Sequence, residues 1–238
     1  MKFKHAYLFL SFLLLFVFLT NVIEVKAMNT GFSTVELSEK DQNSFVSNIS
    51  LSPLTEEPQK REILCFDVNE YGLIAVGQNG VNRKEVCVYN SQGNYLYGYT
   101  FNCSQSFGVE WDGEDINIYF VRSDVIISLS TKGDILDIKK VQNTVDNNKY
   151  SNTLLHSTSR TIGKNTYLIR NDMGILNWTA SSYSQIVIVD AEGVESIIYD
   201  VGSTQFTNSV ALLMIILLFL SVVTAIIIWQ FVKLKRIN

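Results

Sequence analysis

Turns centred on glycine recur through the middle of this chain, and short β-prone segments flank each of them. In residues 88–101, for example, two such segments meet at Gly93. The dipeptide Asp112-Gly113 is typical of a type I′ hairpin. The first two units are about 40 residues apart, and four strands at that period are typical of a β-propeller blade. The turns are expected at Gly72, Gly93, Gly113, Gly133, Gly163 and Gly193.

The third unit is stretched by two insertions that interrupt this period. Residues 142–152 precede the unit, and residues 171–184 lie within it. Insertions in repeat folds usually form loops on one face of the molecule, and loops often carry binding residues. We therefore expect Trp178, with Asn177 and Tyr183 in the same insertion, to belong to a ligand or partner loop.

Runs rich in β-branched and aromatic residues between the turns predict the strands. A further short strand is expected at 45–51, inside a polar stretch at 28–61 that otherwise has the composition of a spacer. The main strands are expected at 63–68, 73–77, 85–89, 95–99, 107–111, 116–121, 125–129, 135–141, 153–162, 167–170, 185–189 and 194–199.

Together these patterns predict an all-β domain at 62–207 with about three four-stranded, propeller-like blades. Closed propellers use four to eight blades. A fourth blade is expected if the strand at 45–51 meets residues 200–206 and closes a small propeller. Otherwise the sheets form a partial propeller, an open and curved stack with a free edge on which another chain can pair.

The segment from Asp67 to Phe101 resembles the blades of NHL- and WD40-like propellers, in which a hairpin such as Val-Tyr-Asn-Ser-x-Gly closes the blade. No unit ends on the Trp-Asp dipeptide found in many such blades. The chain as a whole resembles a family of membrane-anchored proteins. These resemblances imply a fold and bring no activity with them.

The N-terminus has the pattern of a targeting segment. Lys2 and Lys4 precede an apolar run at 6–23, and Val25-Lys-Ala27 offers small residues at a signal-peptidase site. Residues 1–27 are therefore expected to be a signal peptide cleaved after Ala27. The run is also nearly long enough to remain as an uncleaved signal anchor.

The C-terminus is predicted to span a membrane at 208–232. Residues 210–232 carry no charge and reach about 34 Å as a helix, enough to cross a bilayer core. Trp229 is an expected interfacial aromatic, and the basic tail at 233–238 is expected in the cytoplasm. The main domain is then extracytoplasmic, in a single-pass protein of the cell membrane, or a two-pass protein if residues 1–27 stay attached.

The charge distribution argues against two classes of partner. Six of the 19 basic residues but only one of the 23 acidic residues lie in the end segments, so the middle of the chain carries a net charge of about −9. Such a domain repels nucleic acid and the surface of anionic lipids. Nucleic acid is therefore excluded as a partner.

Few residues in the domain have the spacing of a reactive site. Cys65 and Cys87 are expected on strands two apart, about 9 to 10 Å from each other, beyond the roughly 7 Å limit of a disulfide. We expect buried free thiols there, and Cys103 as the alternative partner of one of them. The acidic cluster at 110–115 suggests either a Ca²⁺ loop or a solvated turn, and its spacing favours the turn. His156 is expected on a strand, with no nucleophile motif near it.

The sequence therefore predicts a membrane-anchored, extracytoplasmic binding or sensing module, not an enzyme, with no cofactor or metal and an unidentified ligand. Because the cytoplasmic tail is short, sensing requires a protein partner in the membrane or outside the cell. The alternative is a structural protein that assembles through an open sheet edge. An exported hydrolase is the third and weakest hypothesis.

Overall fold

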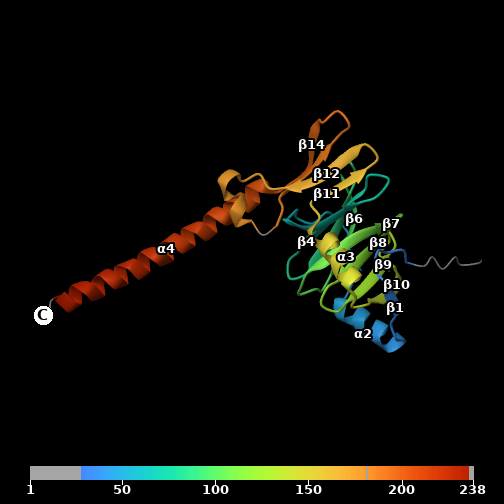
Figure 1. The fold of residues 1–238 in the computed structure, drawn as a ribbon, viewed down its shortest axis with the longest axis horizontal. Coiled ribbons are helices and arrows are strands. Elements are labelled where there is room, and N and C mark those ends of the chain that lie inside the picture. Colours follow the sequence, from blue (N-terminus) through green and yellow to red (C-terminus); the bar gives the residue numbers. More distant parts are fainter. Residues whose placement is uncertain (1–27, 181, 236–238) are drawn as a thin grey trace, which may run out of the picture.

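A computed structural model describes residues 28–180 and 182–235 (Figure 1). The expected signal segment, with its cleavage site after Ala27, lies outside the described residues. The strands are β1 (Thr34–Glu36), β2 (Ser52–Pro53), β3 (Ile63–Val68), β4 (Ile74–Asn79), β5 (Lys84–Tyr89), β6 (Tyr95–Phe101), β7 (Phe107–Asp112), β8 (Asp115–Phe120), β9 (Val125–Leu129), β10 (Ile135–Val141), β11 (Ser159–Ile162), β12 (Asn165–Arg170), β13 (Gln185–Val189) and β14 (Glu195–Asp200). The helices are α2 (Glu39–Ile49), α3 (Val145–His156), the 3-10 helix η1 (Gly174–Thr179) and α4 (Gly202–Lys235).

The three predicted four-stranded units are present as three antiparallel sheets. The first sheet has the order β2-β6-β5-β4-β3, the second β1-β10-β9-β8-β7 and the third β11-β12-β13-β14. In each unit four consecutive strands pair with their neighbours in the chain, as they do in a propeller blade. The spacing of the turn glycines along the sequence therefore predicted the positions of the three four-stranded units correctly.

All six predicted turn glycines have a positive φ, between 59° and 88°. In the second turn of each unit, one side chain accepts hydrogen bonds from the backbone two and four residues further on. These side chains are Asn90, Ser130 and Asp190. The Asp112-Gly113 hairpin forms as well, but its loop residues are Gly113 and Glu114, and only Gly113 has a positive φ. This pattern fits a type II′ turn, so the type I′ prediction was wrong.

The sheets do not close into a propeller within the described residues, and the expected fourth blade is absent there. Residues 45–49 lie in α2, and residues 202–206 begin α4, so neither segment is a strand. Instead, β2 pairs with β6 and β1 pairs with β10, each at the outer edge of a unit. The stretch expected to be a spacer therefore completes two sheets.

The all-β prediction also missed two helices in polar sequence. Ser38 is the N-cap of helix α2, and its side chain accepts a hydrogen bond from the Asp41 amide. Thr144 is the N-cap of helix α3, and its side chain accepts a hydrogen bond from the Asn147 amide. Side-chain caps of this kind stabilise a helix start by about 1 kcal/mol. The fold is therefore mixed and mostly β.

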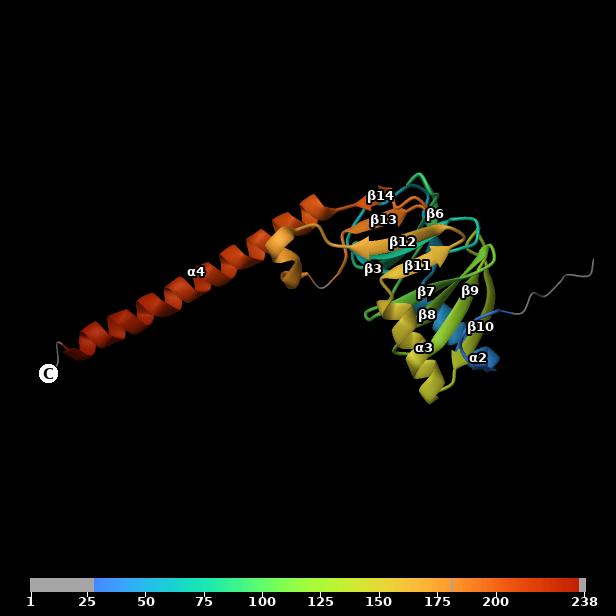
Figure 2. The same cartoon turned by 45° about the horizontal axis from the view of Figure 1, so that its top comes forward.

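The first sheet lies between the other two, and both of its faces are buried. On one face Ala75, Val86 and Val88 join the core formed with the second sheet. On the other face Ile74, Val76 and Tyr89 join the core formed with the third sheet. Helix α3 and the N-terminal strap at 28–33 cover the outer face of the second sheet through Leu154, Tyr150 and Phe32 (Figure 2). The domain is thus an open stack of three sheets, with α3 packed on the outer face of the second sheet.

Asp67 joins the first strands of all three units. Its Oδ2 accepts from the Trp111 amide of β7 at 2.9 Å, and its Oδ1 forms an ion pair with Arg160 Nε of β11 at 2.6 Å. Asp67 itself lies on β3 and is mostly shielded from solvent. One carboxylate therefore fixes how the three sheets meet.

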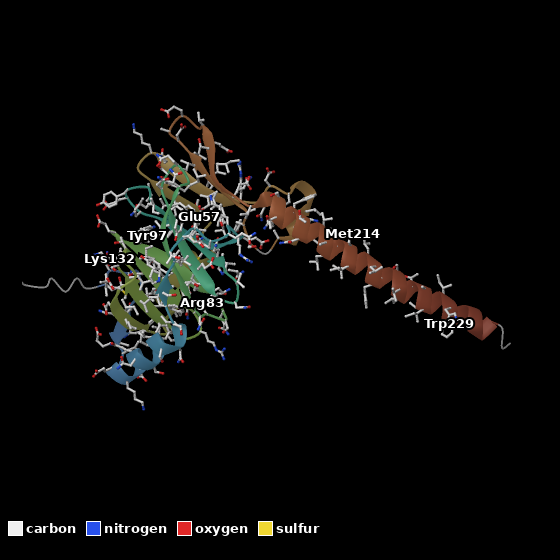
Figure 3. All side chains as sticks on the ribbon, turned by 180° about the vertical axis from the view of Figure 1, so that it is seen from behind. Glu57, Arg83, Tyr97, Lys132, Met214 and Trp229 are labelled. Carbon is white, nitrogen blue, oxygen red and sulfur yellow. The ribbon has the colours of Figure 1, made fainter. Side chains whose placement is uncertain are left out.

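Helix α4 continues directly from β14 and leaves the domain (Figure 1). Asp200 accepts a hydrogen bond from the Gly202 amide at 2.7 Å, and Gln205 is buried with its Nε2 bonded to the Ser182 carbonyl. From Gly202 to Trp229 the helix is long and apolar enough to cross a membrane. Figure 3 shows its side chains, Met214 and Trp229 among them, projecting away from the domain.

The turns at Gly93 and Gly193 offer a matched test of the sheet packing. Both glycines have a positive φ, which costs an alanine about 1 kcal/mol. A Cβ on Gly93 would also lie 2.4 Å from the Ile198 carbonyl oxygen of the third sheet, whereas a Cβ on Gly193 meets nothing within 4 Å. Gly93→Ala should therefore lower the free energy of unfolding by about 1 to 3 kcal/mol more than Gly193→Ala. Denaturant unfolding of both variants in detergent micelles measures the difference, and equal losses would contradict the packing.

Candidate functional site

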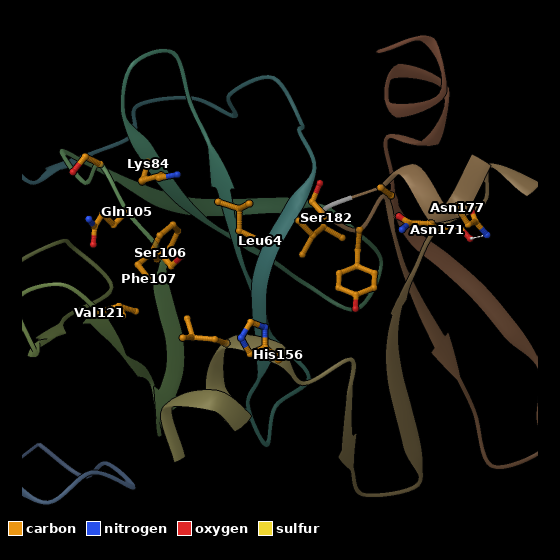
Figure 4. Close-up of a pocket in the computed structure, with 15 residues that line it drawn as sticks. Leu64, Lys84, Gln105, Ser106, Phe107, Val121, His156, Asn171, Asn177 and Ser182 are labelled. Atoms are coloured by element: carbon orange, nitrogen blue, oxygen red, sulfur yellow. Dashed lines mark hydrogen bonds between the residues drawn. The ribbon is translucent and has the colours of Figure 1, made fainter. Parts of the chain in front are cut away.

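A groove of about 780 Å³ is lined in part by the insertion at 171–184, whereas no residue of the insertion at 142–152 lines it. The end of α3 forms one wall and the segment around η1 forms another, with the starts of β3 and β7 between them. Figure 4 shows Gln105, Ser106 and Phe107 on one side and Asn171 and Asn177 on the other. The residues that line the groove are Ile63, Leu64, Lys84, Ser104, Gln105, Ser106, Phe107, Val121, Leu155, His156, Asn171, Asn177, Ala180, Ser182 and Tyr183.

Helix α3 is placed by the packing of Leu154. This side chain is buried against Gly108 of β7, where an added Cβ would lie only 2.8 Å from it. The close approach of helix and strand carries Leu155 and His156, the last residues of α3, to the groove. His156 was expected on a strand, so that prediction was wrong.

The wall around η1 is held by Asn177. Its Oδ1 accepts a hydrogen bond from the Met173 amide at 2.8 Å, and its Nδ2 donates to the Asn171 carbonyl at 3.4 Å. Asn177 therefore closes the turn on which η1 is built. Asn171 Oδ1 is buried and has no hydrogen-bond partner among the described residues.

Tyr183 joins the insertion to the first sheet. Its carbonyl accepts from the Ile63 amide at 2.7 Å, and its amide donates to the Ile63 carbonyl at 3.2 Å. Beside it, Ser182 donates to Glu62 Oε2 at 2.5 Å. The floor of the groove is thus built from backbone pairing between the first unit and the third.

The groove contains two of the three residues expected in a partner loop. Asn177 and Tyr183 line it, whereas Trp178 is not among its lining residues and is 77% exposed. Sequence reasoning missed Lys84 and Ser104–Ser106, which lie outside the third unit, and it gave His156 no part in a binding site. The position of the insertion at 171–184 was the useful signal, but nothing local in the sequence connects it to residues 104–106.

The lining is polar but nearly free of charge. It combines hydroxyl and amide groups with apolar side chains, and Lys84 and His156 are its basic residues. The Lys84 amino group donates to Asn79 Oδ1. None of the described lining residues carries a carboxylate. This chemistry suits a neutral polar ligand that forms hydrogen bonds with the hydroxyl and amide groups of the lining.

The acidic cluster at 110–115 is used in the fold. Glu110 accepts hydrogen bonds from Asn117 and from the Tyr150 hydroxyl of α3, and Asp112 accepts from the Asn29 amide at 2.8 Å. Burial raises the pKa of the Glu110 carboxyl, although its hydrogen bonds oppose the shift. Across residues 28–180 and 182–235, no three His, Cys, Asp or Glu side chains are grouped to hold a metal ion.

The three cysteines are free. Cys65 and Cys87 face the opposite cores of the first sheet, which excludes a disulfide between them. Burial raises the pKa of both thiols to about 12, so they remain protonated at neutral pH. Cys103 is partly exposed, and its thiol donates to the Gln105 carbonyl at 3.3 Å beside the groove.

Comparisons of the chain with protein-family models, with curated proteins and with solved structures found no match. The resemblance to NHL- and WD40-like propellers, which rests on the sequence from Asp67 to Phe101, therefore stays a prediction.

Proposed function

We propose that this protein is a membrane-anchored binding module, without enzymatic activity, whose groove holds a partner on the extracytoplasmic side of the cell membrane. The observation that carries the proposal is the groove itself, formed between the insertion at 171–184, the C-terminal end of α3 and the starts of β3 and β7. Its volume lies in the usual range of ligand sites, about 300 to 1,000 Å³. Its lining of hydroxyl, amide and apolar groups, with Lys84 and His156 as the basic residues, favours recognition by shape and hydrogen bonding.

The membrane anchor in this proposal is α4. The basic residues Lys233 and Lys235 at its C-terminal end support a cytoplasmic tail, which leaves the domain outside.

Photocrosslinking tests the groove. A benzophenone amino acid in place of Gln105, which lines the groove, should give a defined crosslinked product in intact cells. The same residue in place of Lys164, on an exposed hairpin loop, is the control. Ala180→Trp, which fills the groove from the η1 wall, should remove the product, whereas Ala191→Trp in an exposed turn should leave it. A product that survives Ala180→Trp would refute the groove as the binding site.

Cys103 allows a test of the orientation. A membrane-impermeant maleimide should label wild-type protein in intact cells, and Cys103→Ser should remove the signal because Cys65 and Cys87 are buried and protonated. After denaturation, the maleimide should label all three cysteines of the wild type, which controls for the activity of the reagent and the amount of protein. Labelling that requires lysis of the cells would place the domain inside.

A second candidate function, assembly through a sheet edge, has one specific observation in its favour. The outer strands β6 and β10 are each covered by a short strand of the N-terminal segment. The outer strand of the third unit, β14, pairs only with β13 in the part of the chain that the structure describes. Its Ile197 is 52% exposed. An uncovered edge of this kind is a template for pairing with another chain.

Sedimentation of the full-length protein in detergent separates this candidate from the first. If β14 mediates assembly, the wild type is oligomeric and Ile197→Lys shifts it toward the monomer, because a charged residue at an edge disfavours pairing. Val81→Lys, at an exposed loop position, should change nothing. A monomeric wild type would contradict assembly through this edge.

A further inference from the structure

The 3-10 helix η1 lies beside α4 at the level where the apolar run of α4 begins (Figure 1). Met173, which precedes η1, is buried, and its sulfur accepts a hydrogen bond from Ser209 Oγ at 3.8 Å. The next residue of α4, Val210, starts the apolar run. Gly174, with a φ of 57°, turns the chain into η1 at this point.

The position of Ser209 along α4 matches one face of a bilayer. Trp229 lies 20 residues further along the same helix, which is about 30 Å at about 1.5 Å per residue. That length equals the thickness of the hydrocarbon core, about 30 Å. With Trp229 at the cytoplasmic interface, Ser209 and the adjacent η1 therefore lie at the outer interface.

Trp178 of η1 has the properties of a residue that enters this interface. It is 77% exposed, although large aromatic side chains are usually covered in a soluble domain. Tryptophan is enriched at the headgroup level of membranes, where its ring is in apolar surroundings and its N–H stays hydrated. Residues 202–210 of α4 contain neither Trp nor Tyr, so the helix itself brings no such residue to the outer face.

We infer that η1 is a second membrane contact, and that Trp178 inserts into the outer lipid interface beside α4. The contact carries little charge, because Asp172 is the only charged residue in 171–184. The acidic domain offers nothing to anionic headgroups, so the partner is a zwitterionic lipid surface. This inference rests on the proposed span by α4.

The contact has a consequence for the groove. Asn171, Asn177 and Ala180 belong both to the groove and to the segment that carries Trp178. Two points of attachment, α4 and η1, fix the tilt of the domain and hold this wall at the membrane. A partner in the groove is therefore bound close to the lipid surface.

Tryptophan quenching in vesicles tests the inference with the full-length chain. The protein is reconstituted in phosphatidylcholine, either unlabelled or brominated on the acyl chains near the headgroup. Trp229→Phe leaves Trp111 and Trp178, Trp178→Phe leaves Trp111 and Trp229, and the double variant leaves Trp111 alone. A control adds Tyr71→Trp to the double variant, because Tyr71 is 63% exposed at the opposite end of β3 from the groove.

Brominated lipid should quench the Trp229→Phe and Trp178→Phe proteins to similar extents and leave the double variant and the Tyr71→Trp control unchanged. Quenching of Trp229 without quenching of Trp178 would overturn the interface contact while the span stands. Absence of quenching at Trp229 would overturn the span and with it this inference. Circular dichroism of each variant checks that the fold is retained.

Discussion

Burial of the first sheet on both of its faces is the constraint on which the rest of the structure depends. Its strands β4 and β5 have almost no exposed side, because alternate residues enter the core with the second sheet and the core with the third. Apolar burial stabilises by about 25 cal/mol per Å², so an uncovered face of this sheet would be costly. The second and third sheets must therefore stack on it, and Asp67 links their first strands to β3.

The same stacking explains why the ring stays open. Closed propellers have four to eight blades, and this domain has three units. The segments at 45–51 and 200–206, which were expected to form a fourth unit, have other roles. The N-terminal segment covers the outer edges β6 and β10 and packs α2 on the core between the first and second sheets. The segment after β14 begins α4, which is joined to the domain by buried Gln205. The groove lies where the units meet and is lined by residues of all three units.

Much of the secondary structure could be predicted because its causes are local. A glycine with a positive φ defines a turn by itself, and all six predicted turns are found. Helices α2 and α3 were missed because they have few apolar residues, although their capping residues Ser38 and Thr144 were visible. For the site, the insertion at 171–184 was correctly singled out and contributes Asn177 and Tyr183 to the groove. Trp178 of the same insertion is exposed and does not line the groove.

The sequence by itself determined the repeat, its turns and the apolar C-terminal helix, since each depends on residue types within a few positions of one another. Only the tertiary structure decided that the sheets form an open stack, that Cys65 and Cys87 face opposite cores, and that residues 104–106 meet His156 and Asn171 in one groove. Each of these features brings together residues from separate units. They depend on which faces of the three sheets are buried against each other, and this is decided by side-chain packing across the whole domain.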